Sequence, residues 1–329
     1  MNLSHIGMQS VKWRMKMSEN TTPYANSVFE QPWWLDIVAP GKWHEVFVKE
    51  EDKVIARMPY ILDHGHIKMP SNTQTLGPWI DPKYRIFQPG NTQLSKQKEI
   101  INELISQLPK HKSFKMCFDH RNDYILPYRW LDYRYTPSFS YRIKDLSDLD
   151  KVYNNFNKTA KKNIRRAEKI VTISDNQNVD VLLNILKKTF ENQGRKYPGN
   201  EKLIRNIVSK SVARNNGKLF TAIDNEGHIH ASSFLLFDEN CAYALLGGAD
   251  PRYRGSGAKS VVWKHEIMFA AEHSDAFDFE GSNIEGIENF VRQFGGERVT
   301  NYIVSKQSLI SDCLELAKPK IKRLIGYKI

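Results

Sequence analysis

The stretch from Cys241 to His273 constrains the fold of this chain more than any other. It begins with an apolar run of strand character, continues into a loop with the pattern Arg252-x-x-Gly255-x-Gly257, and passes into a helical pattern. Unpaired N–H groups at the start of a helix attract phosphate, and glycines let the backbone approach closely. A strand before such a loop and a helix after it are the context of a phosphate site. The sequence therefore predicts an anion site, with an ordinary strand-to-helix turn as the alternative.

The composition favours a globular protein with anionic partners. The 329 residues suffice for two domains, and 40% are hydrophobic while 26% are charged. The formal net charge of +11 fits nucleic acid, a phosphorylated cofactor, a nucleotide-linked sugar or a membrane surface, and a solvated basic surface is the alternative. No apolar run approaches the roughly 20 residues of a membrane span, so a cytoplasmic protein without a transmembrane segment is predicted. The three cysteines predict free thiols and no metal site.

The chain divides at a seam near 145–150. Residues 1–27 lack periodicity and are predicted to be disordered, with order beginning near Phe29. An N-terminal domain is predicted over 28–145 and a C-terminal domain, which holds the glycine loop, over 146–329. Helical patterns cover 30–39, 94–108, 157–169, 179–193, 201–215, 284–294 and 309–324, and strand patterns cover 43–49, 54–62, 114–118, 218–223, 228–237, 276–280 and 299–305.

The helix predicted after the seam is strongly basic. Lys161, Lys162, Arg165, Arg166 and Lys169 would form one cationic stripe along it. Runs of charge are usually solvated helix faces. The stripe is therefore either a solvated face or a surface that contacts phosphate.

The order of elements in the C-terminal half resembles the GNAT acyltransferase fold. In that family the loop after the fourth strand has the pattern [QR]-x-x-G-x-[GA], which Arg252, Gly255 and Gly257 match. Near the end of the unit, Phe294-Gly295-Gly296 keeps the family's glycine and loses the aromatic residue that follows it. The resemblance implies an α/β fold with mixed sheets.

A closer resemblance is to the FemAB-like branch, in which two GNAT-like domains lie in tandem. It spans about 29–305 and implies the tandem architecture for this chain. The stretches that carry it are Gln31–Asp36, Leu76–Trp79, Lys161–Lys169, Leu246–Asp250 and Phe277–Ser282 through Gly295.

The resemblance also implies a donor and a donor site. The donor would be a coenzyme A thioester, acetyl-CoA or another acyl-CoA, whose pyrophosphate lies in the glycine loop, and no metal is implied. The residues expected to bind it are Leu246, Gly247, Gly248, Arg252, Arg254, Gly255, Ser256, Gly257 and Ala258.

By the same resemblance, an amine attacks the acyl carbonyl directly. Such a reaction needs a proton acceptor and donors facing the developing oxyanion. Backbone N–H groups around Leu246–Gly248 are candidates for the oxyanion donors, and an ordinary strand end is the alternative. Asp278 and Glu280 alternate with phenylalanines, so both are expected on one face of a strand, as catalytic bases or as solvated or salt-bridged acids.

The remaining catalytic and acceptor residues follow from the same alignment. Ser282 and Asn283 would orient the acceptor. Many GNAT enzymes carry a tyrosine acid where this chain has Phe290, which leaves Tyr243 and Tyr302 as substitutes.

Two tryptophans and two arginines complete the predicted site. Trp33 and Trp79 belong either to the core or to the acceptor cleft between the domains. Arg165 and Arg166 of the basic helix are the candidates for contacts with a phosphate or the acceptor.

Three functions compete. The first is an acyl-CoA-dependent N-acyltransferase acting on an amine, such as an amino sugar or another cell-envelope precursor, with anionic small molecules as partners. The second is an aminoacyl-tRNA-dependent transferase of the FemABX type, which would use the basic stripe on tRNA. The third is a non-catalytic binding module, because Phe290 replaces the expected acid.

Overall fold

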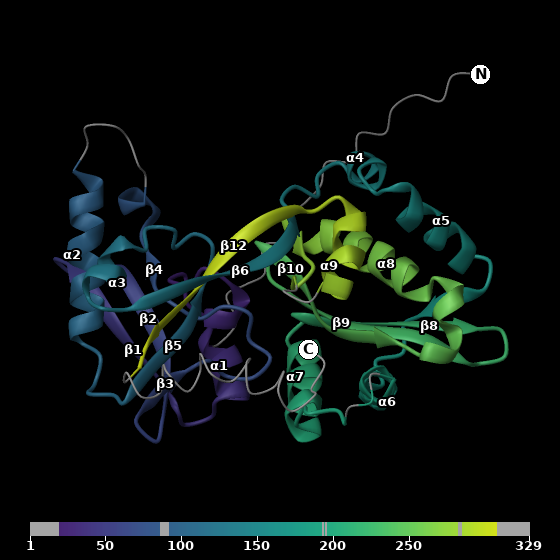
Figure 1. The fold of residues 1–329 in the computed structure, drawn as a ribbon, viewed down its shortest axis with the longest axis horizontal. Helices are drawn as coiled ribbons and strands as arrows, with labels where there is room; N and C mark the ends of the chain where they lie inside the picture. The colour runs from purple at the N-terminus through teal and green to yellow at the C-terminus, as the bar shows by residue number, and fades with distance from the viewer. Residues whose placement is uncertain (1–19, 86–91, 193, 195, 282–284, 308–329) are drawn as a thin grey trace, which may run out of the picture.

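The computed structural model describes residues 20–85, 92–192, 194, 196–281 and 285–307. Figure 1 shows two lobes joined by long strands, with helices packed on the faces of a twisted sheet. Within the described residues, twelve strands form that one sheet, in which parallel and antiparallel pairs are mixed. The predicted α/β class with mixed sheets is confirmed.

The N-terminal lobe begins with short helices and continues through an antiparallel hairpin. The hairpin turns at Glu51, whose φ of +55° is a left-handed conformation that a tight turn requires. The elements of this lobe are η1 (Val28–Glu30), α1 (Pro32–Val38), β1 (Trp43–Glu50), β2 (Lys53–Asp63), β3 (His66–Lys68), β4 (Trp79–Ile80), η2 (Pro82–Tyr84), α2 (Gln93–Ser106), β5 (Ser113–Phe118) and α3 (Leu126–Trp130).

The C-terminal lobe follows the order of helices and strands that the sequence predicts. Several of its helices begin at a capping asparagine or aspartate, as the side chains of Asp148, Asn157 and Asn200 show. The elements are α4 (Leu149–Asn154), α5 (Lys158–Ala167), β7 (Val171–Ser174), α6 (Val179–Glu191), α7 (Glu201–Ala213), β8 (Gly217–Asp224), β9 (Ile229–Phe237), β10 (Cys241–Ala249), η3 (Pro251–Ser256), α8 (Ala258–His273), β11 (Ala276–Asp278), α9 (Glu285–Val291) and η4 (Arg292–Phe294).

Two long strands, β6 (Arg134–Ile143) and β12 (Glu297–Lys306), connect the lobes. They pair antiparallel from Glu297 opposite Arg142 to Ser305 opposite Arg134. The far half of β12 pairs with β5 of the N-terminal lobe, and β6 pairs with β11 of the C-terminal lobe (Figure 1). The strand order is β1-β2-β3-β5-β12-β6-β11-β10-β9-β8-β7, with β4 beside β2. The sheet is therefore continuous across the predicted seam.

The helices of the C-terminal lobe cover both faces of its sheet. α6 and α7 pack on one face of β8, β9 and β10, and α8 packs on the other, with α5 outside it (Figure 1). One hydrophobic cluster lies under α8, and the other runs from the α6 and α7 face into the N-terminal lobe. Phe29 of η1 meets Tyr243 of β10 within that second cluster, with ring centroids 4.8 Å apart. The core thus joins the lobes as the sheet does.

Three predicted element boundaries compare with the structure as follows. Ordered structure begins before the predicted Phe29, because Asn26 and Ser27 are buried and the Asn26 amide donates to Glu30 Oε2 at 2.6 Å. The strand predicted to reach Glu280 ends at Asp278, because pairing with β6 stops at Arg142. The predicted helix over 309–324 and most of the segment 1–27 lie outside the described residues.

Two features are absent from the described part of the chain. No helix found there has the length and apolar character needed to cross a membrane. Nor do His, Cys, Asp and Glu side chains in these ranges gather in a group suited to hold a metal ion.

Candidate functional site

The parallel pairing of the two central strands of the C-terminal lobe ends where β11 ends, about a third of the way along β10. β10 pairs in parallel with β11 only from Cys241 to Tyr243, and beyond that point β9 is its strand neighbour among the described residues. A bulge between Tyr243 and Leu246 shifts the register with β9 at the same place. A bulge bends a strand and interrupts its ladder. The predicted donor segment Leu246–Gly248 therefore lies on the part of β10 that no longer pairs with β11.

Helix side chains pack over Gly247 and Gly248 from both faces of the sheet. A Cβ at Gly247 would lie 2.6 Å from Lys259 Nζ of α8, and a Cβ at Gly248 would lie 2.3 Å from Thr189 Oγ1 of α6. Real Cβ atoms do not make contacts this short, so a larger residue would displace a helix side chain. Packing alone therefore explains why both positions are glycine, whether or not a ligand binds.

The turn after β10 is organised by Asp250. Its carboxylate is 1% exposed, caps η3 through the Arg252 amide at 3.0 Å, and accepts from Lys188 Nζ at 2.8 Å and Arg252 Nη2 at 2.8 Å. The hydrogen bond from Arg252, followed by the contacts with Lys188, holds the pKa of Asp250 well below its usual range. The Arg252 side chain is nevertheless 67% exposed. Arg252 thus braces the loop from outside and keeps a surface open to solvent.

Gly257 and Gly255 differ in what their positions demand. Gly257 has a φ of +79°, and a Cβ there would lie 2.6 Å from the backbone oxygen of Asn163 in α5. Gly255 has nothing within 4 Å of its Cβ position. At the start of α8, the Ala258 amide donates to Ser256 Oγ at 3.2 Å. The loop is therefore pressed against α5 at Gly257 and open at Gly255.

The basic helix α5 lies directly against this loop. It packs on η3 and on α8, and its inner residues Ala160, Ile164 and Ala167 are buried. Arg165 and Arg166 are exposed on its outer side, where Arg165 Nε donates to Lys161 O at 3.4 Å and Arg166 Nη2 donates to Asn163 Oδ1 at 2.9 Å. With the exposed Arg254, they give the surroundings of the loop a positive charge.

Asp278 is part of a buried ion pair that connects the lobes. It is 0% exposed and accepts from Arg142 Nε at 3.1 Å and Nη2 at 3.0 Å. Gln74 Nε2 of the N-terminal lobe donates to it at 3.0 Å, and Ser140 Oγ at 2.5 Å. A carboxylate held by these donors is an anchor, and the alternative reading of Asp278 as a salt-bridged acid describes this geometry.

Glu280 lies in a left-handed turn just after β11, so strand alternation does not place it on one face with Asp278. Its φ is +60°, and its amide donates to Asp278 Oδ1 at 2.8 Å. Its Oε1 is buried without a hydrogen-bond partner among the described residues. Burial, followed by the charge of Asp278, raises the pKa of the Glu280 carboxyl well above its ordinary value. Its surroundings therefore favour the protonated form of this carboxyl.

Tyr243 belongs to the core. It is 1% exposed, and burial raises the pKa of its hydroxyl well above the ordinary value. The second substitute, Tyr302, packs edge-on against Tyr135 on β6. Phe290 packs on Trp263, with ring centroids 4.8 Å apart. Ser282 and Asn283 lie outside the described residues.

The two predicted tryptophans differ in setting. Trp33 is 5% exposed in the core cluster that joins the lobes, and Arg214 of the C-terminal lobe lies over its ring. Trp79 is half-buried beside Tyr24, with ring centroids 5.1 Å apart. Of the two, only Trp79 has a surface that an acceptor can reach.

Sequence reasoning missed several polar residues that the structure places at the parting of β10 and β11. Arg142 and Gln74 hold Asp278, and Lys259 and Glu266 face the sheet from α8. The i and i+7 spacing of Lys259 and Glu266 is visible in the sequence and puts them on one helix face. Arg142 and Gln74 come from distant segments, and no local pattern identifies them.

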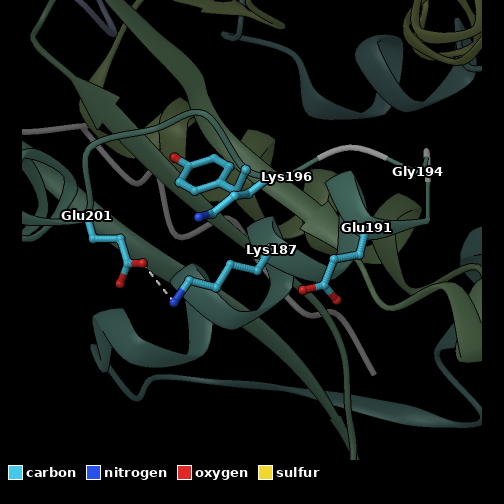
Figure 2. A pocket seen from close by; sticks show the side chains of 6 residues that line it. Lys187, Glu191, Gly194, Lys196 and Glu201 are labelled. Atoms are coloured by element: carbon cyan, nitrogen blue, oxygen red, sulfur yellow. Dashed lines mark ion pairs between the residues drawn. The ribbon is translucent and has the colours of Figure 1, made fainter.

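A cavity of about 500 Å³ lies between α6 and α7, away from this arrangement. Figure 2 shows charged side chains around it, including the ion pair of Lys187 Nζ with Glu201 Oε1 at 2.8 Å. None of the predicted site residues lines it. Its lining residues are Lys187, Glu191, Gly194, Lys196, Tyr197 and Glu201.

A strand that parts from its parallel neighbour and ends in a glycine loop at a helix start defines a GNAT-type acyl-transfer fold. Residues 154–288 match the family model described as acetyltransferase (GNAT) domain. These residues thus form a GNAT-type acyltransferase domain, as the motifs predicted.

Solved structures share the fold over both lobes. FemX aligns with a TM-score of 0.62 at 14% identity, covering 87% of this chain and 93% of its own. The C-terminal domain of a putative lysylphosphatidylglycerol synthetase from Agrobacterium fabrum aligns with a TM-score of 0.53 at 12% identity, covering 87% and 90%. L-PGS from Bacillus licheniformis aligns with a TM-score of 0.50 at 13% identity, covering 89% and 91%. No curated protein matches the sequence. The FemX-like architecture therefore extends beyond the GNAT match to most of the chain.

Proposed function

We propose that this acyltransferase moves an acyl group from acyl-CoA, with acetyl-CoA as the first candidate, to the amine of an anionic acceptor such as an amino sugar or another cell-envelope precursor. The observation that carries the proposal is the loop from η3 into α8, which is open at Gly255 and flanked by the exposed Arg252 and Arg254. Helix-start amides and arginines suit a diphosphate. The donor's acyl arm would then lie along β10, where that strand has left β11.

In this proposal the amine attacks the acyl carbonyl directly. Free backbone amides of Leu246–Gly248 are the candidates for donors to the oxyanion, since this segment pairs with a strand on one side. Glu280, at the end of β11, is the candidate for removing the ammonium proton, and its raised pKa makes it a strong base once ionised. Activity is then expected to rise with pH through the raised pKa of Glu280.

Titration with coenzyme A tests the donor. We expect coenzyme A to bind, and Arg254→Gln and Arg252→Gln each to weaken binding about tenfold, the effect of one lost charge-assisted hydrogen bond. Arg129→Gln, an equal change of charge at an exposed position of α3, is the control and is expected to bind normally. Calorimetry gives the affinities. If all three variants bind coenzyme A as tightly as the parent protein does, the loop is not part of the donor site.

A second candidate donor is aminoacyl-tRNA, because the fold is similar to FemX and α5 places exposed cations beside the loop. Filter binding of a charged tRNA to the protein, and to the double variant Arg165→Gln/Arg166→Gln, tests it. Binding of tRNA that depends on these arginines, without binding of coenzyme A, would favour this candidate over the first.

A further inference from the structure

The inner face of α8 carries polar side chains where the helix packs on the sheet. Lys259, Trp263 and Glu266 are spaced i, i+4 and i+7, so they share one face. Glu266 is 0% exposed and Trp263 is 5% exposed. Nε1 of Trp263 lacks a hydrogen-bond partner among the described residues, and so do both carboxyl oxygens of Glu266 by distance and angle, although, against the larger effect of burial, the nearby Ser233 hydroxyl lowers the pKa of that carboxyl. Buried polar atoms are nearly always paired, so this face needs an explanation beyond packing.

The amine of Lys259 lies against the donor segment of β10. Its Nζ donates to Ser233 Oγ at 3.0 Å, and that hydroxyl donates to the backbone oxygen of Leu246 at 3.1 Å. The same Nζ occupies the space over Gly247, where a Cβ would lie 2.6 Å away. The Lys259 side chain is half-buried. The amine is therefore held beside the strand along which the proposed donor lies, on the α8 face.

The surroundings of this amine ease the loss of its proton. Burial lowers the pKa of Lys259, against an opposing influence of Glu266. Burial also raises the pKa of Glu266 to about 7, which weakens that influence at and below neutral pH. The described groups that face Nζ are the Ser233 hydroxyl from β9 and, from α8 itself, the ring of Trp263 at 5.1 Å and the Glu266 carboxyl. A lysine freed of its proton is a nucleophile.

We infer that Lys259 is a self-acylation site, an internal acceptor that takes the acyl group from a donor bound along β10. The inference rests on the proposed function, since it needs a thioester donor. The neutral Nζ attacks the thioester carbonyl carbon, a C–N bond forms, and the C–S bond breaks. The proton that Nζ loses passes to the leaving sulfur, so coenzyme A departs as the thiol.

Acylation of Lys259 changes the donor site itself. The amide carries no charge, and the added acyl group extends from the Nζ atom that already lies over Gly247 of the donor segment. The modified chain is therefore expected to bind the donor less well, and self-acylation limits the enzyme when no external amine is present.

Incubation of the intact protein with acetyl-CoA, followed by mass spectrometry of its peptides, tests the inference. We expect one acetyl group on Lys259, loss of that label in Lys259→Arg, and slower labelling in Arg252→Gln, which weakens the donor site. The matched control is Lys264→Arg on the next turn of α8, whose partner is Glu168 at 2.7 Å. It is expected to leave the label on Lys259 unchanged.

An excess of coenzyme A distinguishes a failure of the self-acylation inference from a failure of the proposed function. If it binds by calorimetry and suppresses the label on Lys259, the inference is supported. If it binds and Lys259 gains no acetyl group, or gains it no faster than exposed lysines do, the inference is wrong while the donor assignment stands. If coenzyme A does not bind the parent protein, the proposed function fails first.

Discussion

At the scale of single residues, the contacts of Asp278 indicate a structural role and not a catalytic one. The Asp278 and Arg142 side chains are 0% and 6% exposed, so solvent does not screen their charges. Removing one partner of a buried pair leaves the other uncompensated, at a cost of about 3–5 kcal/mol. Asp278→Asn is therefore expected to lower the free energy of unfolding, measured in urea, by an amount of that order.

The control for this prediction is Asp180→Asn. Asp180 pairs with Arg205 on the surface, where both side chains are largely exposed. Solvent screens such pairs, so stability is expected to change little. A variant Asp278→Asn that unfolds like the parent protein but loses acyl transfer would contradict the architectural role and restore Asp278 as a base.

At the scale of elements, the sequence predicted most helices and strands of the C-terminal lobe because their patterns are local. Helix α6, for example, starts at the cap Asn178 and buries Leu182, Ile185 and Leu186 on one side, a periodicity visible in the sequence. The ladder that joins β12 to β5 and β6 was not predictable, because it pairs segments more than 150 residues apart. The position of Glu280 was missed because it depends on the left-handed turn after β11, which no local pattern in the sequence indicates.

The glycine loop permits a prediction at this scale. Gly257→Ala places a Cβ 2.6 Å from Asn163 O at a φ of +79°, so both strain and collision oppose it. Its expected cost is about 1–3 kcal/mol in urea unfolding, with weaker coenzyme A binding as α5 shifts from the loop. Gly255→Ala in the same loop meets open space and is the matched control. Equal effects of the two substitutions would show that the contact with α5 does not shape the loop.

At the scale of the whole molecule, buried acids in both lobes make stability depend on pH. Burial raises the pKa of Glu30 and of Glu266 to about 7 and that of Asp238 to about 6. Between about pH 4.5 and 7 the folded chain therefore binds more protons at these sites than the unfolded chain does. Their contribution is fully present below the unfolded values and is lost as pH rises through the folded values.

The melting temperature is accordingly expected to fall between about pH 5 and pH 8. The pKa shift of Glu30, from 4.5 to about 7, corresponds to about 3 kcal/mol lost across this range. Glu30→Gln removes that proton uptake and is expected to flatten the decline by a similar amount, because Gln keeps an oxygen for the Asn26 amide. Glu226→Gln, on the exposed turn between β8 and β9, is the control. A decline of the same slope in Glu30→Gln and in the parent protein would show that Glu30 is ionised in the folded chain.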